Sequence, residues 1–209
     1  MSGAVIGGLY AITPDETDTA ELLRKVHLAL LGGMRMLQYR NKIADTKLQL
    51  EQAGALRELA HKFAVPLIVN DNVVLAKQVA ADGVHLGVAD GSVADARALL
   101  GNNKIIGVSC YNRLELAHAA VKQRANYVAF GAFFLSAIKP GAVKADVDLL
   151  QKARHELNVP IVAIGGITPA NGGALIDAGA NALAVISALW DAPDITGTTK
   201  KFSTIFKDK

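Results

Sequence analysis

Cysteine is almost absent: the 209 residues contain only Cys110, so the chain cannot form an intramolecular disulfide bond. This excludes the small disulfide-stabilised scaffolds of secreted proteins and predicts a cytoplasmic location. No apolar run approaches the roughly 20 residues that a transmembrane helix needs, and Met1 to Tyr10 lack the basic start of a secretory signal. We therefore expect neither a membrane partner nor export.

Aromatic side chains and clustered cations are also scarce. Aromatics make up 5% of the residues, and the formal net charge is only +3. Proteins that follow a nucleic-acid backbone usually show a basic track with stacking aromatics, and this sequence has no such stretch. We therefore expect no nucleic-acid partner, and small anionic substrates fit better.

Aliphatic residues are abundant and occur in short, regularly spaced runs. Several runs, such as 67–69 and 161–164, are apolar at every position, which is typical of parallel strands covered on both faces. Amphipathic segments separate the runs, as at 20–31, 46–63, 113–124 and 146–157. The runs number eight, at residues 9–12, 34–38, 66–70, 83–86, 104–108, 127–130, 160–164 and 182–186.

Eight strand–helix units in 209 residues allow about 26 residues a unit, enough for a closed (β/α)₈ barrel, the TIM-barrel fold. We predict this α/β fold as a single domain over residues 1–209, with only the end from about residue 198 loosely tied. The alternative is an open doubly wound sheet, which would need a Gly-rich turn after the first strand. Thr13 and Pro14 stand there instead, so the barrel is favoured.

Polar side chains follow the second strand at alternating positions. Gln38, Arg40 and Lys42 can all point to one side if the strand persists. Barrel enzymes place their sites where strands end, so these residues predict a clamp for a polyanion. A solvated loop that carries two cations by chance is the alternative interpretation.

Aspartates follow the third and fourth strands. Asp71 comes directly after Asn70, and Asp90 lies a few residues beyond His85. Because these strands are neighbours in a barrel, the two carboxylates can converge on one hard cation. The alternative for each aspartate is a helix N-cap, particularly for Asp90 with Ser92 nearby.

The residues that follow the remaining predicted strands indicate phosphate binding. Ser109 follows the fifth run, and Lys139 lies near the tip of a Gly/Pro-rich loop after the sixth. A Schiff-base lysine would need a pKa lowered by burial, so a phosphate-binding cation is favoured for Lys139. Gly166 and Ser187 follow the last two strands, where barrels commonly hold a phosphate with backbone N–H groups.

Read together, these exits resemble the thiamine phosphate synthase family. No single element is diagnostic, but the ordered set extends over nearly the whole chain. The matching segments are Tyr10–Thr13, Gln38–Lys42, Asn70–Asp71, Asp82–Gly87, Gly107–Ser109, Lys139, Ala163–Ile167 and Ile186–Ser187.

The resemblance implies roles for particular residues at the strand ends. Asp71 and Asp90 would bind the cofactor Mg²⁺, and Arg40, Lys42 and Lys139 would act in catalysis by stabilising the departing pyrophosphate. The aminopyrimidine diphosphate would be held by Gln38, Arg40, Lys42, Asn70, Ser109 and Lys139. The second substrate, hydroxyethylthiazole phosphate, would be held by Ser136, Ile138, Gly166, Ile186 and Ser187.

The implied reaction agrees with what the sequence lacks. A thiazole nitrogen attacks with its own lone pair, so a dissociative loss of pyrophosphate followed by capture needs no general base, and no convincing His or Glu base is visible. The partners would be two small phosphorylated substrates, and the sequence leaves open whether the chain forms a homo-oligomer. Four histidines on predicted helices are expected at the surface: His27, His61, His118 and His155. His85 lies in a predicted strand and could belong either to the core or to the site.

The loop after the sixth strand departs from the family pattern. Pro-Thr-x-Thr-Lys is expected, whereas residues 135–139 read Leu-Ser-Ala-Ile-Lys, so Ile138 lacks a hydroxyl. Losing a hydrogen bond to a charged group costs about 1.5–3 kcal/mol. This departure keeps open a non-catalytic or regulatory relative that only binds thiamine precursors. A thiazole tautomerase is less favoured because Ala132 stands where its histidine is expected, and a phosphosugar isomerase would need an acid–base pair that is not visible.

Overall fold

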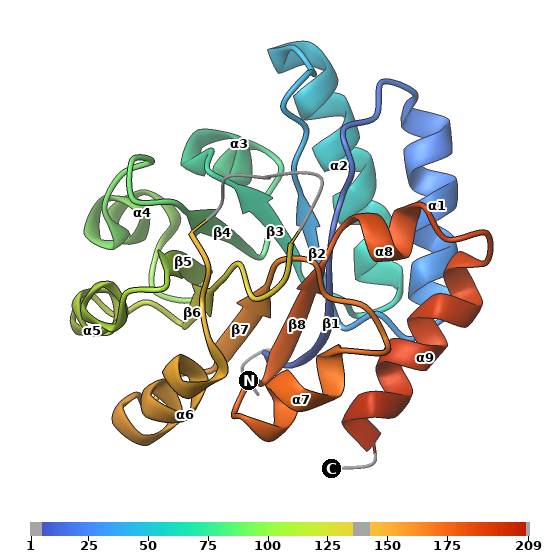
Figure 1. Cartoon of the computed structure of the whole chain (residues 1–209). Coiled ribbons are helices and arrows are strands. Elements are labelled where there is room, and N and C mark those ends of the chain that lie inside the picture. The colour runs from blue at the N-terminus through green and yellow to red at the C-terminus, as the bar shows by residue number, and fades with distance from the viewer. Residues whose placement is uncertain (1–5, 136–142, 208–209) are drawn as a thin grey trace.

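The computed structural model describes residues 6–135 and 143–207, and eight parallel strands in it close into a barrel (Figure 1). Each strand pairs with the next along the chain, and β8 pairs with β1. The predicted (β/α)₈ fold is confirmed, and the strands lie within a few residues of the predicted runs. They are β1 (Gly8–Ile12), β2 (Met36–Tyr39), β3 (Leu67–Asn70), β4 (Gly83–Leu86), β5 (Ile105–Tyr111), β6 (Tyr127–Phe130), β7 (Ile161–Ile164) and β8 (Ala182–Val185).

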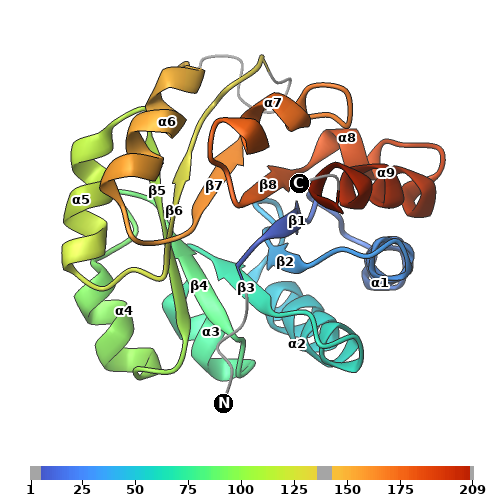
Figure 2. The ribbon, with the colours of Figure 1, turned by 90° about the horizontal axis from the view of Figure 1, so that it is seen from below.

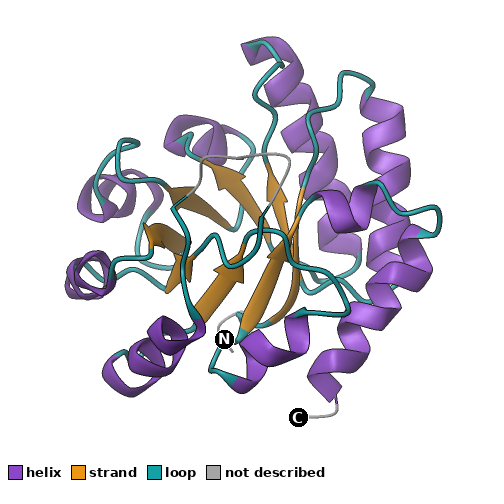
Figure 3. Cartoon of the chain, in the orientation of Figure 1, coloured by secondary structure: helices purple, strands orange, loops and turns teal. Residues whose placement is uncertain are grey.

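Helices surround the strands on the outside, as the view from below in Figure 2 and the colouring in Figure 3 show. Among the described residues, no helix is long and apolar enough to cross a bilayer. The helices are α1 (Thr19–Leu31), α2 (Thr46–Lys62), α3 (Val73–Gln78), α4 (Val93–Leu100), α5 (Leu114–Lys122), α6 (Val147–Glu156), α7 (Gly172–Asp177), α8 (Ser187–Trp190) and α9 (Ile195–Lys207).

The continuous apolar runs fill two separate parts of the core. Successive residues of a strand point to opposite faces, so Leu37 packs outward against helices while its neighbour Met36 points into the barrel. On β3, Leu67 and Ile68 divide in the same way. Burial on both faces explains why these strands lack an alternating pattern.

Within the described residues, the C-terminal segment is firmly packed, which corrects the expectation of a loosely tied end from about residue 198. Residues 195–207 form α9, in which Thr199 and Phe202 are fully buried. Thr196 Oγ1 donates to Leu28 O of α1 at 2.9 Å. The apolar face of this helix, marked by Phe202, covers α1 and the outside of the barrel, so the end is attached by burial as well as by hydrogen bonds.

Candidate active site at the strand ends

Acidic and basic side chains meet at the C-terminal ends of β2 and β3. Lys42 Nζ lies 2.6 Å from Asp71 Oδ2. Asn70 Nδ2 donates to the same carboxylate oxygen at 2.6 Å. The structure thus brings together three residues that the sequence assigned to one site, although they come from two strands.

The backbone of Asp71 is held in an unusual conformation. Its φ is +60°, in the left-handed region that non-glycine residues rarely adopt. Two backbone hydrogen bonds maintain it: Asp71 N donates to His85 O at 2.8 Å, and Asn72 N donates to Asn70 O at 2.7 Å. Asn72, not Asp71, caps α3, so the carboxylate of Asp71 is left for another role.

Asp90 reaches the same place from the loop after β4. Gly87 N donates to Asp90 Oδ2 at 2.9 Å, and a side chain at Gly87 would collide with that oxygen. Ser92 caps α4, which excludes the N-cap interpretation of Asp90. Asp90 is an exposed residue, but local desolvation and then the neighbouring Asp71 carboxyl raise its pKa, while Gly87 N–H and Lys42 lower it. Two carboxylates that repel each other favour a cation between them.

The donor set fits magnesium. Within residues 6–135 and 143–207, no group of three or more His, Cys, Asp or Glu side chains could hold a metal. Mg²⁺ is commonly held by one or two carboxylates and completed by waters and substrate phosphates. The pair of Asp71 and Asp90 matches that arrangement and does not form a closed, all-protein cage.

The loop after β1 positions the cations of β2, which sequence reasoning missed. Thr13 Oγ1 donates to Arg40 O at 2.7 Å and accepts from Arg40 N at 2.8 Å. Asp15 Oδ1 accepts from Arg40 Nη1 at 3.1 Å and from Lys42 N at 2.7 Å. Thr13 is fully buried. A polar residue at the end of an apolar strand was the sequence feature that could have indicated its role in positioning Arg40.

Gly166 and the start of α8 occupy the opposite part of the mouth, at the ends of β7 and β8. Gly166 has a φ of +60°, and a side chain there would collide with the backbone at Leu135 and Phe134. The loop after β6 therefore passes directly over this glycine. Ile186 precedes α8 and Ser187 begins it. The other residues expected on this side, Ser136, Ile138 and Lys139, lie outside the described residues.

Gln38 and Ser109 are joined by a chain of hydrogen bonds through the inside of the barrel. Gln38 Nε2 donates to Tyr10 Oη at 2.7 Å, and Tyr10 Oη lies 2.8 Å from Tyr127 Oη. His85 bridges the rest: Nδ1 lies 2.9 Å from Tyr127 Oη and Nε2 lies 2.8 Å from Ser109 Oγ. The sequence left His85 undecided between core and site. It gave no role to either tyrosine, although both occupy inward-facing positions of their strands. The four remaining histidines are exposed, as predicted.

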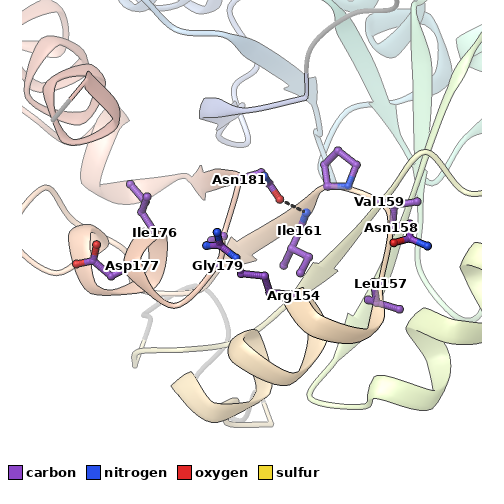
Figure 4. A pocket seen from close by; sticks show the side chains of 11 residues that line it. Arg154, Leu157, Asn158, Val159, Ile161, Ile176, Asp177, Gly179 and Asn181 are labelled. Carbon is purple, nitrogen blue, oxygen red and sulfur yellow. Dashed lines mark hydrogen bonds between the residues drawn. The ribbon is translucent and has the colours of Figure 1, made fainter. Parts of the chain in front are cut away.

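A surface hollow at the other end of the barrel carries no comparable chemistry. It lies around the start of β7, between the ends of α6 and α7 (Figure 4). Asn181 Oδ1 accepts a hydrogen bond from Ile161 N at 2.8 Å there, and Arg154 packs against Gly179. Features at this end of such barrels generally serve stability.

The chain forms a (β/α)₈ barrel whose strand ends carry a carboxylate pair, neighbouring cations and a glycine-lined loop. This combination is typical of an enzyme that acts on small phosphorylated molecules. The family model described as thiamine monophosphate synthase matches residues 9–189. The chain belongs to this family, and the predicted resemblance is confirmed.

Named relatives support the assignment over nearly the full length. A thiamine-phosphate synthase of Methylobacillus flagellatus is 55% identical over 96% of this chain and 96% of its own. One of Thiobacillus denitrificans is 50% identical, with 96% of this chain and 95% of its own covered. Among solved structures, a thiamine phosphate pyrophosphorylase from Pyrococcus furiosus superposes with a TM-score of 0.86 at 33% identity and covers 96% of both chains.

Proposed function

We propose that the chain is a thiamine phosphate synthase. It condenses 4-amino-2-methyl-5-hydroxymethylpyrimidine diphosphate with hydroxyethylthiazole phosphate and releases pyrophosphate, as a transferase of thiamine biosynthesis in the cytoplasm. The observation that carries the proposal is the contact of Lys42 with Asp71 beside Asp90, in a chain that belongs to the synthase family. Carboxylates for a metal and cations for a diphosphate are what departure of pyrophosphate requires.

The residues on the β2–β4 side would hold the diphosphate. Asp71 and Asp90 would bind Mg²⁺, which when bound neutralises charge on the leaving pyrophosphate. Arg40 and Lys42 approach from the neighbouring loop as further cations, with Arg40 held in place by Asp15. Lys139, from the loop after β6, would complete the cationic set.

The mechanism proposed is dissociative. The bond between the pyrimidine methylene and the diphosphate oxygen breaks, the electron pair leaves with pyrophosphate, and the thiazole nitrogen captures the resulting cation. No proton has to be removed from that nitrogen. In agreement, the buried His85 already has a polar partner at each ring nitrogen, and burial lowers its pKa to about 4.

The residues on the β7–β8 side would hold the thiazole phosphate. Gly166 and the backbone at Ile186 and Ser187 would approach the phosphate closely, and Ser136 and Ile138 would contribute from the loop after β6. Backbone N–H groups suit an anion because they donate without needing a charged side chain.

The decisive experiment is an assay of purified protein with Mg²⁺ and both substrates. We expect thiamine phosphate and pyrophosphate in equal amounts, and Asp71→Ala should lower kcat by at least about a hundredfold. Asp148→Ala, which removes an exposed carboxylate in the first turn of α6, is the matched control and should retain activity. Precursor binding without product would instead support the regulatory relative.

A further inference from the structure

The hydrogen-bond chain between Gln38 and Ser109 takes one direction if every buried hydroxyl proton is to have an acceptor. The 2.8 Å contact between Tyr10 Oη and Tyr127 Oη is compatible with either donor. Because the Gln38 amide donates to Tyr10 Oη, Tyr127 Oη is the acceptor that the described contacts leave for the Tyr10 proton. Tyr127 then donates to Nδ1 of His85, and a neutral imidazole that accepts at Nδ1 carries its proton on Nε2. That proton goes to Ser109 Oγ.

The interior groups are all neutral, which this direction requires. Burial raises the pKa of both Tyr10 and Tyr127. Neither ring nitrogen of His85 has a carboxylate partner, because the two partners are the hydroxyls of Tyr127 and Ser109. At neutral pH each phenol therefore keeps its proton, and the imidazole offers one donor and one acceptor.

Neighbouring residues in the barrel interior leave space for the Tyr127 phenol and pack against it. Gly107 on β5 faces inward, where large branched residues usually fill a barrel. A side chain at Gly107 would collide with the Tyr127 ring and hydroxyl. The His85 ring stacks on the Tyr127 ring with centroids 5.5 Å apart. The phenol thus takes up space in the core that an aliphatic side chain could have filled, at a position where its hydroxyl reaches both Tyr10 and His85.

We propose that Tyr10, Tyr127 and His85 are positioning residues that order the donor and acceptor offered to the aminopyrimidine ring. With its amide N–H bound to Tyr10, Gln38 presents its carbonyl oxygen as the acceptor, and no described residue donates to that oxygen. With its oxygen occupied by His85 Nε2–H, Ser109 presents its hydroxyl proton as the donor.

This pattern is complementary to an aminopyrimidine, which offers amino N–H donors and ring-nitrogen acceptors. The order at the two ends is coupled: reversing the interior protons would turn Gln38 into a donor and Ser109 into an acceptor. A relay of neutral groups would thus help to select the ring, separately from the charges that hold the diphosphate. The inference about substrate selection rests on the proposed function.

The first test reads the proton positions directly. In ¹⁵N-histidine NMR of the full chain, His85 is identified by the signal lost in His85→Gln, and we expect its Nε2–H tautomer. Tyr127→Phe should alter that tautomer signal, and Tyr10→Phe is a second variant if the first does not fold. Tyr39→Phe is the control, since it removes a buried tyrosine hydroxyl that donates to Gln52 outside the barrel. An Nδ1–H tautomer in the unmodified protein would overturn the proposal.

The second test is kinetic. Tyr127→Phe should lower kcat/KM for the pyrimidine diphosphate about tenfold, the upper range for one neutral hydrogen bond, while KM for the thiazole phosphate stays within about twofold. In the Ser109→Ala background, the further effect of Tyr127→Phe should fall below about twofold, because coupled residues are not additive. A full tenfold loss in both backgrounds would overturn the relay. An inactive unmodified protein would contradict the proposed function, and the NMR tautomer would still decide the proton order.

Discussion

Lys42 Nζ and Asp71 Oδ2 are 2.6 Å apart, so a cation from the loop after β2 neutralises a carboxylate at the end of β3. The pair is partly open to solvent, where a single ion pair contributes at most about 1 kcal/mol to stability. Because this contact at the strand ends contributes so little to stability, it is better explained by a role in ligand binding. We expect Lys42 to leave Asp71 for the diphosphate when Mg²⁺ binds.

Replacing Lys42 should therefore weaken binding of the diphosphate much more than it weakens the fold. Lys42→Met should lower kcat/KM for the pyrimidine diphosphate about ten- to a hundredfold, because one charge-assisted hydrogen bond is lost. The measurement is steady-state kinetics, with thermal unfolding to monitor the fold. Lys47→Met, an exposed lysine of α2, is the control and should change neither quantity, whereas equal losses in both variants would contradict a specific role for Lys42.

Asp90→Asn should separate metal binding from folding. The raised pKa of Asp90 means that its ionised form is penalised in the folded protein. The sign follows from linkage: the penalty is absent at low pH and appears as pH rises through the folded-state pKa. In EDTA at pH 7, Asp90→Asn should therefore unfold at the same temperature or slightly higher, and it should lose the stabilisation that Mg²⁺ gives the unmodified protein. Retained Mg²⁺ stabilisation would remove Asp90 from the metal site.

Cys110 should be inert in the folded protein. Burial raises its pKa from 9.0 to about 12, and the side chain is fully buried on the outer face of β5. At pH 8 the thiolate fraction falls by about a thousandfold, and only the thiolate reacts readily. A thiol reagent followed by absorbance should label the native protein at least about a hundred times more slowly than the guanidinium-unfolded protein, and rapid native labelling would show that β5 opens.

Two glycine-to-alanine substitutions should act in opposite directions. Gly107→Ala places a methyl group against Tyr127 and should lower the free energy of unfolding by about 3 kcal/mol, the cost of overpacking a core. Gly54→Ala, within α2, meets nothing within 4 Å and should raise it by about 0.5–1 kcal/mol. Urea unfolding measures both, and a stabilising Gly107→Ala would show that the Tyr127 ring lies elsewhere.

Local patterns predicted most of the fold. The runs at 83–86 and 127–130 coincide with β4 and β6, and the segment 46–63 exceeds α2 by a single residue. Burial on both faces leaves a continuous apolar signature, and one buried helix face leaves a periodic one. The C-terminal end was misjudged because the burial of α9 depends on packing against the distant α1, which no local pattern indicates.

The candidate site was only partly predictable for the same reason. Residues at strand ends could be identified one at a time, and closure of the barrel in sequence order placed Asp71 near Asp90. The partners of Arg40 could not be read in this way, because Thr13 and Asp15 become neighbours of β2 only after β1 pairs with it.

The sequence by itself determined the barrel, the family and the residues of the carboxylate pair, because periodicity and ordered motifs are local properties of the chain. Only the tertiary structure decided which groups touch inside the barrel. Tyr10 and Tyr127 are 117 positions apart, yet their hydroxyls share a hydrogen bond. Their alignment depends on the stagger of the strands and on the space left by Gly107, and both are consequences of packing.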